Sequence, residues 1–254
     1  MDARFAVCRG ISDRFSEALV REPSAGPPDV ERARRQHAAY VDALRQAGCE
    51  VVLLPPLDGH PDCCFVEDCA VVAQGVALAT RPGALSRRSE VPSVREILSR
   101  WLRVADMPAP ATLDGGDCLR IGRTIFVGRS ERTNAEGAAR LREVFGALGL
   151  DVREVEVPDA LHLKCVCSAL DDRRVVLAEG TVPAETFAGF EVLRVPFEER
   201  LAANVLSVNG VALVADGFPE TRRVVAAAGL RVVTLETTEI AKADGALTCM
   251  SVLV

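Results

Sequence analysis

Short apolar stretches that follow a glycine recur along the chain. Four of them match closely: AGCEVVLL at 47–54, LGLDVREV at 148–155, AGFEVLRV at 188–195 and AGLRVVTL at 228–235. Gly149, Gly189 and Gly229 are 40 residues apart, and the larger offset of Gly48 leaves room for a degenerate unit around WLRVADMP. Self-similarity at such a period indicates a repeat architecture. The pattern therefore predicts five related units.

Each of the clearer units contains two short strands, an amphipathic helix and a returning strand. One unit reads DCLRIG, TIFVGR, NAEGAARLREVFGAL and LDVREVEV, and the last unit repeats this order. Apolar residues at three- and four-residue spacing predict one buried helix face, and Gly149 is expected to end that helix in a left-handed conformation. The residues of that face are Ala138, Leu141, Val144, Phe145 and Leu148. Units of this kind bury their faces on each other, which predicts a closed ring with a central channel.

Acidic residues interrupt one apolar segment, PDCCFVEDCAVV at 61–72. We interpret this segment as a strand, in which alternation places Asp62 and Asp68 on one face and Glu67 on the other. Most acidic runs are solvated loops, but apolar surroundings argue against that here. Because the planar guanidinium matches carboxylates bidentately, these acids favour a guanidinium ligand.

Two further segments carry polar residues next to predicted strands. LDGGDCL at 113–119 places Asp114 and Asp117 on a tight turn at a strand start, a common turn signal. ALHLKCVC at 160–167 places His162 between leucines at the start of an apolar strand. A lone histidine in that position is more often a hydrogen-bonded core residue than a catalyst.

Cys249 lies in the apolar terminal run DGALTCMSVLV, where it is either a packing residue or a nucleophile. If it is a nucleophile, it needs an acid–base partner. The chain has three histidines: His37 falls in a highly charged helix and His60 in a loop beside a proline. His162 is therefore the best candidate.

Composition narrows the function classes. The 36 acidic and 30 basic residues give a net charge of -6, the wrong sign for binding nucleic acid or an anionic membrane, and favour a small cationic ligand.

No apolar run approaches the roughly 20 residues of a membrane span, and the charged start MDARFAVCRG lacks the apolar core of a signal peptide. We therefore expect a soluble cytoplasmic protein. Most of the nine cysteines are expected to be reduced and buried. CC at 63–64 and CVC at 165–167 lack the paired spacing of a zinc site. The segment REPSAGPPD at 21–29 reads as a surface loop or as a lid over the channel.

The motifs FVEDCAVV, TRPGALSRR, TLDGGD, ERTNAEGA, LHLK, AAN and DGALTCMSV, in this order, resemble those of the dimethylarginine dimethylaminohydrolases, from about residue 5 to the end. The resemblance implies the pentein fold, a five-bladed α/β propeller of ββαβ-type pseudo-repeats around a central channel, formed by residues 1–254 as a single domain. It also implies hydrolysis of Nω-methylated arginines to citrulline, with no cofactor and no metal. The sequence leaves open whether the chain forms a homodimer.

The same resemblance implies the catalytic residues. Cys249 of LTCMS corresponds to the nucleophile and His162 of LHLK to the general acid and base. Asp114 of LDGGD corresponds to an acidic position that engages both the guanidine and the histidine.

Substrate-binding residues are implied in the same way. Glu67 and Asp68 of FVED would hold the guanidinium, Asp62 of PDCC the α-ammonium group, and Arg87 and Arg132 the carboxylate. The resemblance further implies that Leu19 belongs to a lid and that Ala243 touches the ligand largely through its backbone. Alanine at position 243 is smaller than the branched residue expected there, which leaves the pocket width open.

Three alternatives fit part of this pattern. Arginine deiminases resemble the core motifs but usually carry a helical insertion that is not visible between FVED and LDGGD. Agmatine deiminase acts on a substrate without a carboxylate and would not require Arg87 and Arg132. A non-catalytic pentein, such as the ribosome-binding translation factor of similar fold, has no reason to combine Cys249, His162 and the acidic cluster.

Overall fold

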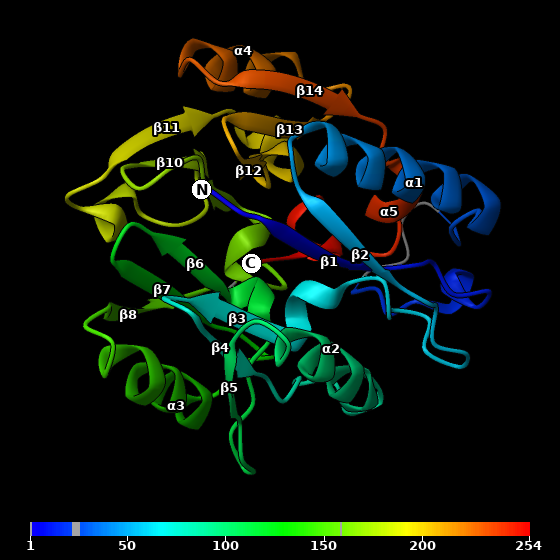
Figure 1. Cartoon of the computed structure of the whole chain (residues 1–254). Helices are drawn as coiled ribbons and strands as arrows, with labels where there is room; N and C mark the ends of the chain where they lie inside the picture. The colour runs from blue at the N-terminus through cyan, green and yellow to red at the C-terminus, as the bar shows by residue number, and fades with distance from the viewer. Residues whose placement is uncertain (1, 22–25, 158) are drawn as a thin grey trace.

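Five three-stranded sheets follow one another around a ring in the computed structural model, which describes residues 2–21, 26–157 and 159–254 (Figure 1). The five predicted units are confirmed, and the fold is the five-bladed α/β propeller expected from the sequence. The first sheet contains β15 (Val252–Leu253), β1 (Phe5–Arg9) and β2 (Glu50–Leu54); the second β3 (Ala70–Ala73), β4 (Val76–Ala79) and β5 (Arg103–Asp106); the third β6 (Cys118–Ile121), β7 (Thr124–Arg129) and β8 (Asp151–Glu156); the fourth β9 (Cys167–Ala169), β10 (Arg174–Ala178) and β11 (Glu191–Val195); the fifth β12 (Leu206–Val208), β13 (Val211–Ala215) and β14 (Arg231–Leu235).

Every sheet has the same strand directions. The middle strand pairs antiparallel with one neighbour and parallel with the other; in the third sheet Phe126 of β7 lies opposite Leu119 of β6 and Arg153 of β8. An antiparallel pair needs only a tight turn, whereas a parallel pair needs a crossover connection. The first sheet differs in its chain order, because the C-terminal strand β15 pairs with β1 and thereby closes the ring (Ala6 opposite Leu253).

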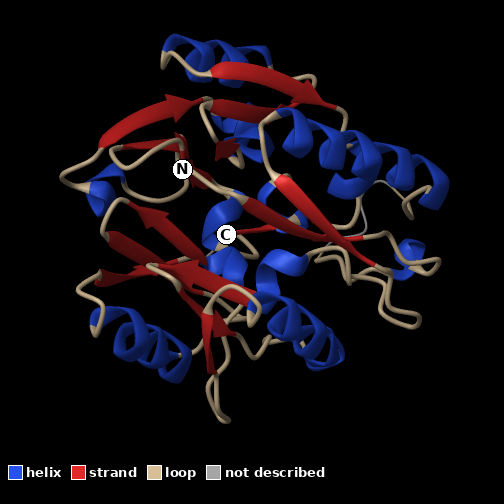
Figure 2. Cartoon of the chain, in the orientation of Figure 1, coloured by secondary structure: helices blue, strands red, loops and turns tan. Residues whose placement is uncertain are grey.

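Helices supply most of the crossovers and lie on the outside of the ring (Figure 2). They are α1 (Val30–Gln46), α2 (Val91–Leu98), α3 (Ala135–Gly146) and α4 (Pro219–Ala227), with the short α5 (Thr238–Ala241) near the C-terminus. In the fourth unit the described crossover contains only a short 3-10 helix, Ala184–Phe187. No helix in the described ranges is long and apolar enough to cross a bilayer.

The glycines that revealed the repeat all have a left-handed backbone. Gly48, Gly149, Gly189 and Gly229 have φ angles of 90°, 76°, 94° and 82°. An L-residue with a side chain rarely adopts this region, so glycine ends the crossover and turns the chain into the returning strand. The predicted left-handed cap at Gly149 is confirmed.

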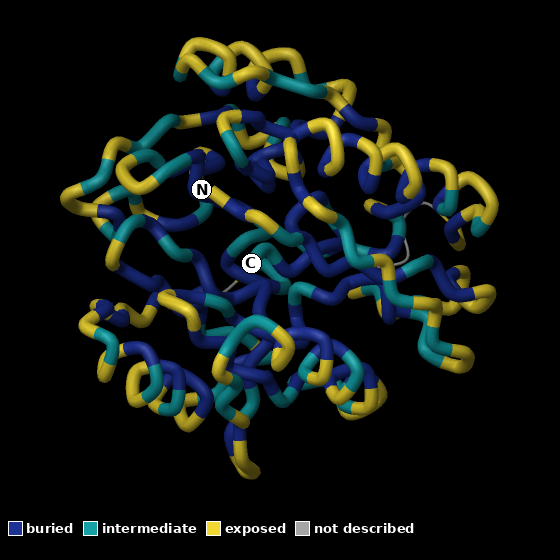
Figure 3. The backbone as a smooth tube through the Cα atoms, viewed as in Figure 1, coloured by how far each residue is buried: buried dark blue, intermediate teal, exposed yellow. Residues whose placement is uncertain are grey.

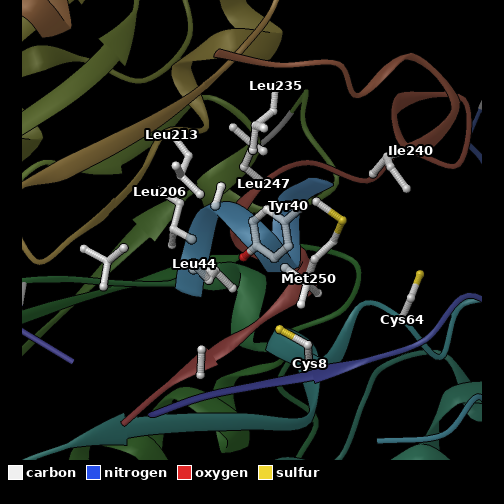
Figure 4. Packing of buried hydrophobic residues seen from close by; sticks show 14 of the residues in the cluster. Cys8, Tyr40, Leu44, Cys64, Leu206, Leu213, Leu235, Ile240, Leu247 and Met250 are labelled. Atoms are coloured by element: carbon white, nitrogen blue, oxygen red, sulfur yellow. The ribbon is translucent and has the colours of Figure 1, made fainter. Parts of the chain in front are cut away.

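Each sheet is buried on both faces, because alternate residues of a strand point to opposite neighbours. In β10, Val175 and Leu177 pack against the third sheet, whereas Val176 and Ala178 pack against the fifth. Five such clusters, one between each pair of adjacent sheets, form the described core. Figure 4 shows the cluster between the first and fifth sheets, where Tyr40 of α1 packs among Leu206, Leu213 and Met250. Exposed residues are confined largely to the periphery of the ring (Figure 3).

A short 3-10 helix precedes the first strand of every sheet. These helices are η2 (Val66–Cys69), η4 (Gly115–Asp117), η5 (Leu163–Cys165), η7 (Phe197–Ala203) and η8 (Thr248–Met250). The contacts of η2 with η4 and η8, and of η5 with η4 and η7, bring them together, and Figure 2 shows short helical turns in the middle of the ring. The five repeats therefore place five turns at one common location.

Two strand predictions are wrong at these turns. The acidic segment 61–72 is not one strand: it runs through turns and η2, and only Ala70–Ala73 is extended. His162 does not begin a strand either, because η5 follows it and β9 starts at Cys167. By contrast, the predicted turn of LDGGDCL at a strand start is confirmed by η4 and β6. Part of the predicted loop or lid at 21–29, residues 22–25, lies outside the described residues.

Candidate active site

A cavity lies where the turns meet, lined by Leu19, Asp62, Phe65, Asp68, Arg87, Arg132, Leu161, His162, Ala243, Asp244, Gly245 and Cys249. Eight of these twelve lining residues were selected from the sequence, from segments up to 230 residues apart (19 to 249). The other two selected residues lie elsewhere. Asp114 is fully buried next to His162, and Glu67 faces a second cavity along the centre of the ring.

Cys249 is placed by a compact turn between α5 and β15. It is the middle residue of η8 and lies, partly buried, at the edge of the cluster between the first and fifth sheets. Gly245 allows this loop to approach η2, because a side-chain carbon at that position would lie 2.3 Å from the ring of Phe65. Close packing therefore brings Cys249 to the wall formed by Phe65 and Asp68.

His162 is held from two sides by the LDGGD turn. Its Nε2 donates a hydrogen bond to Asp114 Oδ2 at 3.0 Å, and the backbone N–H of Leu163 donates to Asp117 Oδ1 at 3.0 Å. A side-chain carbon at Gly116 would lie 2.7 Å from His162 Nδ1, so only glycine permits this approach. The motif thus supplies both an acidic partner and the space for the imidazole.

Asp68 and His162 form a charged pair within the cavity. Asp68 accepts hydrogen bonds from the N–H of Gly116 (2.9 Å) and from Arg87 Nη1 (2.5 Å). Burial favours the neutral carboxyl, but the charges of His162 and Arg87 outweigh it and lower the pKa of Asp68 to about 2. Burial likewise opposes the imidazolium, yet Asp68 and Asp114 raise the pKa of His162 well above its ordinary value. His162 is therefore protonated at neutral pH and can act as an acid.

The Cys249 thiol is neutral in the free protein. Burial raises its pKa well above the ordinary value, and the negative charges of Glu67 and Asp68 raise it further. A cationic ligand in the cavity would oppose both effects, because a nearby positive charge favours the thiolate. The carboxylates therefore have two effects: they attract a cationic ligand, and they raise the pKa of the thiol. Once bound, the ligand's positive charge opposes the second effect.

The two selected arginines differ in their surroundings. Arg87 is buried, and its guanidinium is already engaged by Asp68, by Glu90 (2.9 Å) and by the carbonyl of Phe65 (2.8 Å). Arg132 is half-buried, and within the described ranges its guanidinium has no hydrogen-bond or ion-pair partner. Only Arg132 is thus free to bind a carboxylate without giving up an existing ion pair. The sequence did not indicate that Arg87 is paired and Arg132 is not, because no motif assigned a role to Glu90, the partner of Arg87.

Glu67 is also engaged. Its carboxylate accepts hydrogen bonds from Lys164 Nζ (2.5 Å) and Thr248 Oγ1 (2.8 Å), and these residues line the central cavity of about 130 Å³. Asp62 faces the candidate active site and accepts a hydrogen bond from the backbone N–H of Leu19 at 3.0 Å. This bond ties the predicted lid leucine to the predicted ammonium-binding acid.

Asp68, Asp114 and His162 are the one group of described residues whose ligand atoms lie close enough to hold a metal ion, within 4.8 Å of one another. Their donors are already engaged, however: His162 by Asp114, and Asp68 by Arg87 and Gly116. The group fits an acid–base assembly better than a metal centre.

Known proteins resemble this chain in sequence and in fold. Residues 27–253 match the family described as N,N dimethylarginine dimethylhydrolase, eukaryotic. A dimethylarginine dimethylaminohydrolase of Streptomyces coelicolor is 40% identical over 254 residues, covering 99% of this chain and 97% of that protein. One from Pseudomonas aeruginosa is 37% identical over 228 residues, covering 89% and 90%.

Solved structures agree with these matches. The Pseudomonas aeruginosa enzyme, solved as a cysteine-to-serine variant complexed with citrulline, superimposes with a TM-score of 0.96 at 33% identity and full coverage of both chains. The N-terminal domain of ArgZ, a cyanobacterial arginine dihydrolase, superimposes with a TM-score of 0.88 and covers 100% of this chain and 98% of its own. At 19% identity the second likeness shows the fold alone.

Proposed function

Because the chain belongs to the dimethylarginine dimethylaminohydrolase family, we propose that it hydrolyses asymmetric dimethylarginine and monomethylarginine to citrulline, releasing dimethylamine or methylamine. One observation carries the proposal: Cys249 and the hydrogen-bonded pair His162–Asp114 come together at a cavity that also holds Asp62 and Asp68. A nucleophile, an acid and cation-binding carboxylates are the groups that amidine hydrolysis requires.

In the proposed mechanism the carboxylate of Asp68 holds the planar guanidinium next to Cys249. The charge of the bound substrate favours loss of the Cys249 thiol proton to solvent. The resulting thiolate attacks the central guanidinium carbon and forms a C–S bond. His162 gives its proton to the departing alkylamine as the C–N bond breaks, which leaves a covalent thiouronium. His162 then removes a proton from water, the hydroxide forms the C–O bond of citrulline, and the C–S bond breaks. Asp114 keeps the imidazole in place throughout.

The remaining selected residues have proposed binding roles. Asp62 binds the α-ammonium group, Arg132 together with Arg87 binds the carboxylate, and Leu19 covers the ligand. Glu67 acts on the guanidinium from behind Asp68, since its own carboxylate is occupied by Lys164 and Thr248. Ala243 contributes backbone contacts and leaves space beside the ligand. The single-domain organisation and the cytoplasmic location also stay predictions, and neither sequence nor structure decides whether the chain forms a homodimer.

Methylated arginines are expected to react with an efficiency about tenfold or more above that of arginine. Leu19, Phe65 and Leu161 give the cavity an apolar lining, and each methyl group buried there contributes about 0.8 kcal/mol. Initial rates at subsaturating concentrations of the three substrates, with dimethylamine, methylamine and ammonia quantified separately, test this expectation. Ammonia from arginine as the dominant product would identify an arginine deiminase instead, and no citrulline from any substrate would favour a non-catalytic binder.

Arg87→Ala and Arg132→Ala are expected to have different effects. Removing Arg87 leaves Asp68 and Glu90 buried without their guanidinium, which should lower the free energy of unfolding by about 3–5 kcal/mol. Arg132→Ala should change that stability by only about 0.5 kcal/mol while raising the KM of amino-acid substrates. Urea unfolding and steady-state kinetics of both variants check this pair. Equal losses of stability would contradict the distinction.

A further inference from the structure

Four buried or nearly buried residues form a hydrogen-bonded ring below the candidate active site: Glu67, Lys164, Asn204 and Thr248. Three of its links join side chains, and the backbone carbonyl of Lys164 closes the ring. Glu67 accepts from Lys164 Nζ (2.5 Å) and from Thr248 Oγ1 (2.8 Å). Asn204 Nδ2 donates to Thr248 Oγ1 (3.0 Å) and to the carbonyl of Lys164 (2.8 Å). The N–H of Thr248 donates to Asn204 Oδ1 (2.9 Å). We call these four residues the turn ring.

The turn ring joins four of the five turns that meet at this end of the propeller. Glu67 lies in η2 directly before Asp68, Thr248 lies in η8 directly before Cys249, and Lys164 lies in η5 two residues after His162. Asn204 follows η7, a turn that contributes no residue to the cavity lining. Asn204 therefore has no contact role at the cavity, but its side chain ties the nucleophile's turn to the histidine's turn.

The hydrogen bonds of Asn204 fix its amide in one orientation. Its oxygen accepts from Thr248 N–H while its nitrogen donates to the Lys164 carbonyl, so exchanging the two atoms would set donor against donor and acceptor against acceptor. Asn204 is 2% exposed and Thr248 5% exposed. Water therefore cannot easily replace a missing partner, and a fully satisfied buried network of this kind specifies one arrangement of the segments it joins.

We propose that Asn204 and Thr248 are positioning residues, which hold Cys249 at its reactive distance from His162 and from the guanidinium bound at Asp68. This inference rests on the proposed hydrolysis, whose covalent step requires a near-attack geometry. A misplacement of about 1 Å can slow such a step on the order of a hundredfold. The contribution of the turn ring lies mainly in kcat, because Asp62, Asp68 and Arg132, which line the cavity and bind the substrate, are not members of the ring.

Thr248→Val tests the proposal with nearly the same side-chain shape. Valine lacks the hydroxyl that bonds to Glu67 and Asn204, so kcat for dimethylarginine should fall about tenfold to a hundredfold, whereas KM should change less than about threefold. Thr248→Ser keeps the hydroxyl and should restore most of kcat. Asn204→Ala should resemble Thr248→Val, and if it fails to fold, the valine and serine pair alone decides.

Ser207→Ala is the matched control. Ser207 is also buried, in β12, and donates to the carbonyl of Leu170 without contacting the turn ring. It should lower the melting temperature but leave kcat within about twofold. A kcat that stays within threefold of wild type in folded Thr248→Val and Asn204→Ala would overturn the proposal, as would an equal loss of kcat in Thr248→Val and Thr248→Ser.

Alkylation of Cys249 by iodoacetamide, mapped by mass spectrometry without substrate, separates this inference from the proposed function. An opened ring should let water reach the thiol, lower its pKa and accelerate its alkylation at pH 7 in Thr248→Val but not in Thr248→Ser. The seven buried cysteines report any general unfolding. If wild type forms no citrulline while this contrast holds, the proposed function is wrong and the positioning role stands. If wild type is active and the contrast is absent, the positioning role is wrong.

Discussion

Cys249→Ser is expected to abolish citrulline formation, with a loss on the order of 10⁴-fold or more, while the protein stays folded. Loss of a nucleophile costs this much in enzymes with covalent catalysis, because a hydroxyl at neutral pH is a far weaker nucleophile than a thiolate. Serine is nearly isosteric with cysteine, and Cys249 lies only at the edge of its apolar cluster, so stability should change little. Citrulline assays and thermal unfolding of the variant measure both effects.

Trapping the intermediate identifies the attacking sulfur directly. Wild type quenched during turnover should carry a covalent adduct on the peptide containing Cys249, and the serine variant should carry none. Cys165→Ser is the matched control, because Cys165 and Cys249 are the two partly exposed cysteines. Retained activity in Cys249→Ser, or an adduct on another of the nine cysteines, would contradict the assignment.

His162→Asn is expected to lower kcat by about 10²- to 10⁴-fold at every pH from 6 to 9, because a general acid and base contributes that much. Asparagine fits in the space of the imidazole but has no proton that it can transfer to the leaving amine. The raised pKa keeps His162 protonated through neutral pH, so the wild type should retain its acid at pH values where an ordinary histidine is neutral. The KM should change less than kcat, since the carboxylates that bind the substrate remain.

His60→Asn provides the control for this substitution. His60 bonds to Ser89 and does not line the cavity, so its replacement should leave kcat within about twofold. Near-normal turnover by His162→Asn would instead make His162 a structural core residue, the more common role for a histidine between two leucines.

Local patterns were sufficient to predict the repeat and much of its content. The 40-residue spacing, the glycines before the returning strands and the helical face around Leu141 are periodic features, and each has a direct structural counterpart. Local pattern was insufficient in the acidic segment at 61–72. There, alternation predicted a strand, but Arg87 draws Asp68 and the carbonyl of Phe65 toward its guanidinium, and the chain turns instead. Periodicity cannot detect a partner that lies 19 residues away.

The motifs also did not distinguish residues that line the candidate active site from residues that face the central channel. Glu67 and Asp68 are adjacent in sequence, yet Asp68 lines the cavity while Glu67 faces the central channel and bonds to Lys164 and Thr248. Asn204 lies in the motif AAN, but the sequence assigned no role to it. Its function in the turn ring depends on groups 40 and 44 residues away, and no local pattern records such contacts.

What the sequence determined by itself is the set of units and their chemistry, because strand alternation, helical spacing and left-handed glycines act over a few residues and repeat at a fixed period. The tertiary structure alone decided how those units share their functional groups. Closure of the ring by β15 against β1 brings the C-terminal turn beside η2, and the same closure places five turns at one end of the channel. Burial then decides which carboxylates are paired internally and which remain for a ligand, since a charge removed from water must find its partner among neighbours that only the fold provides.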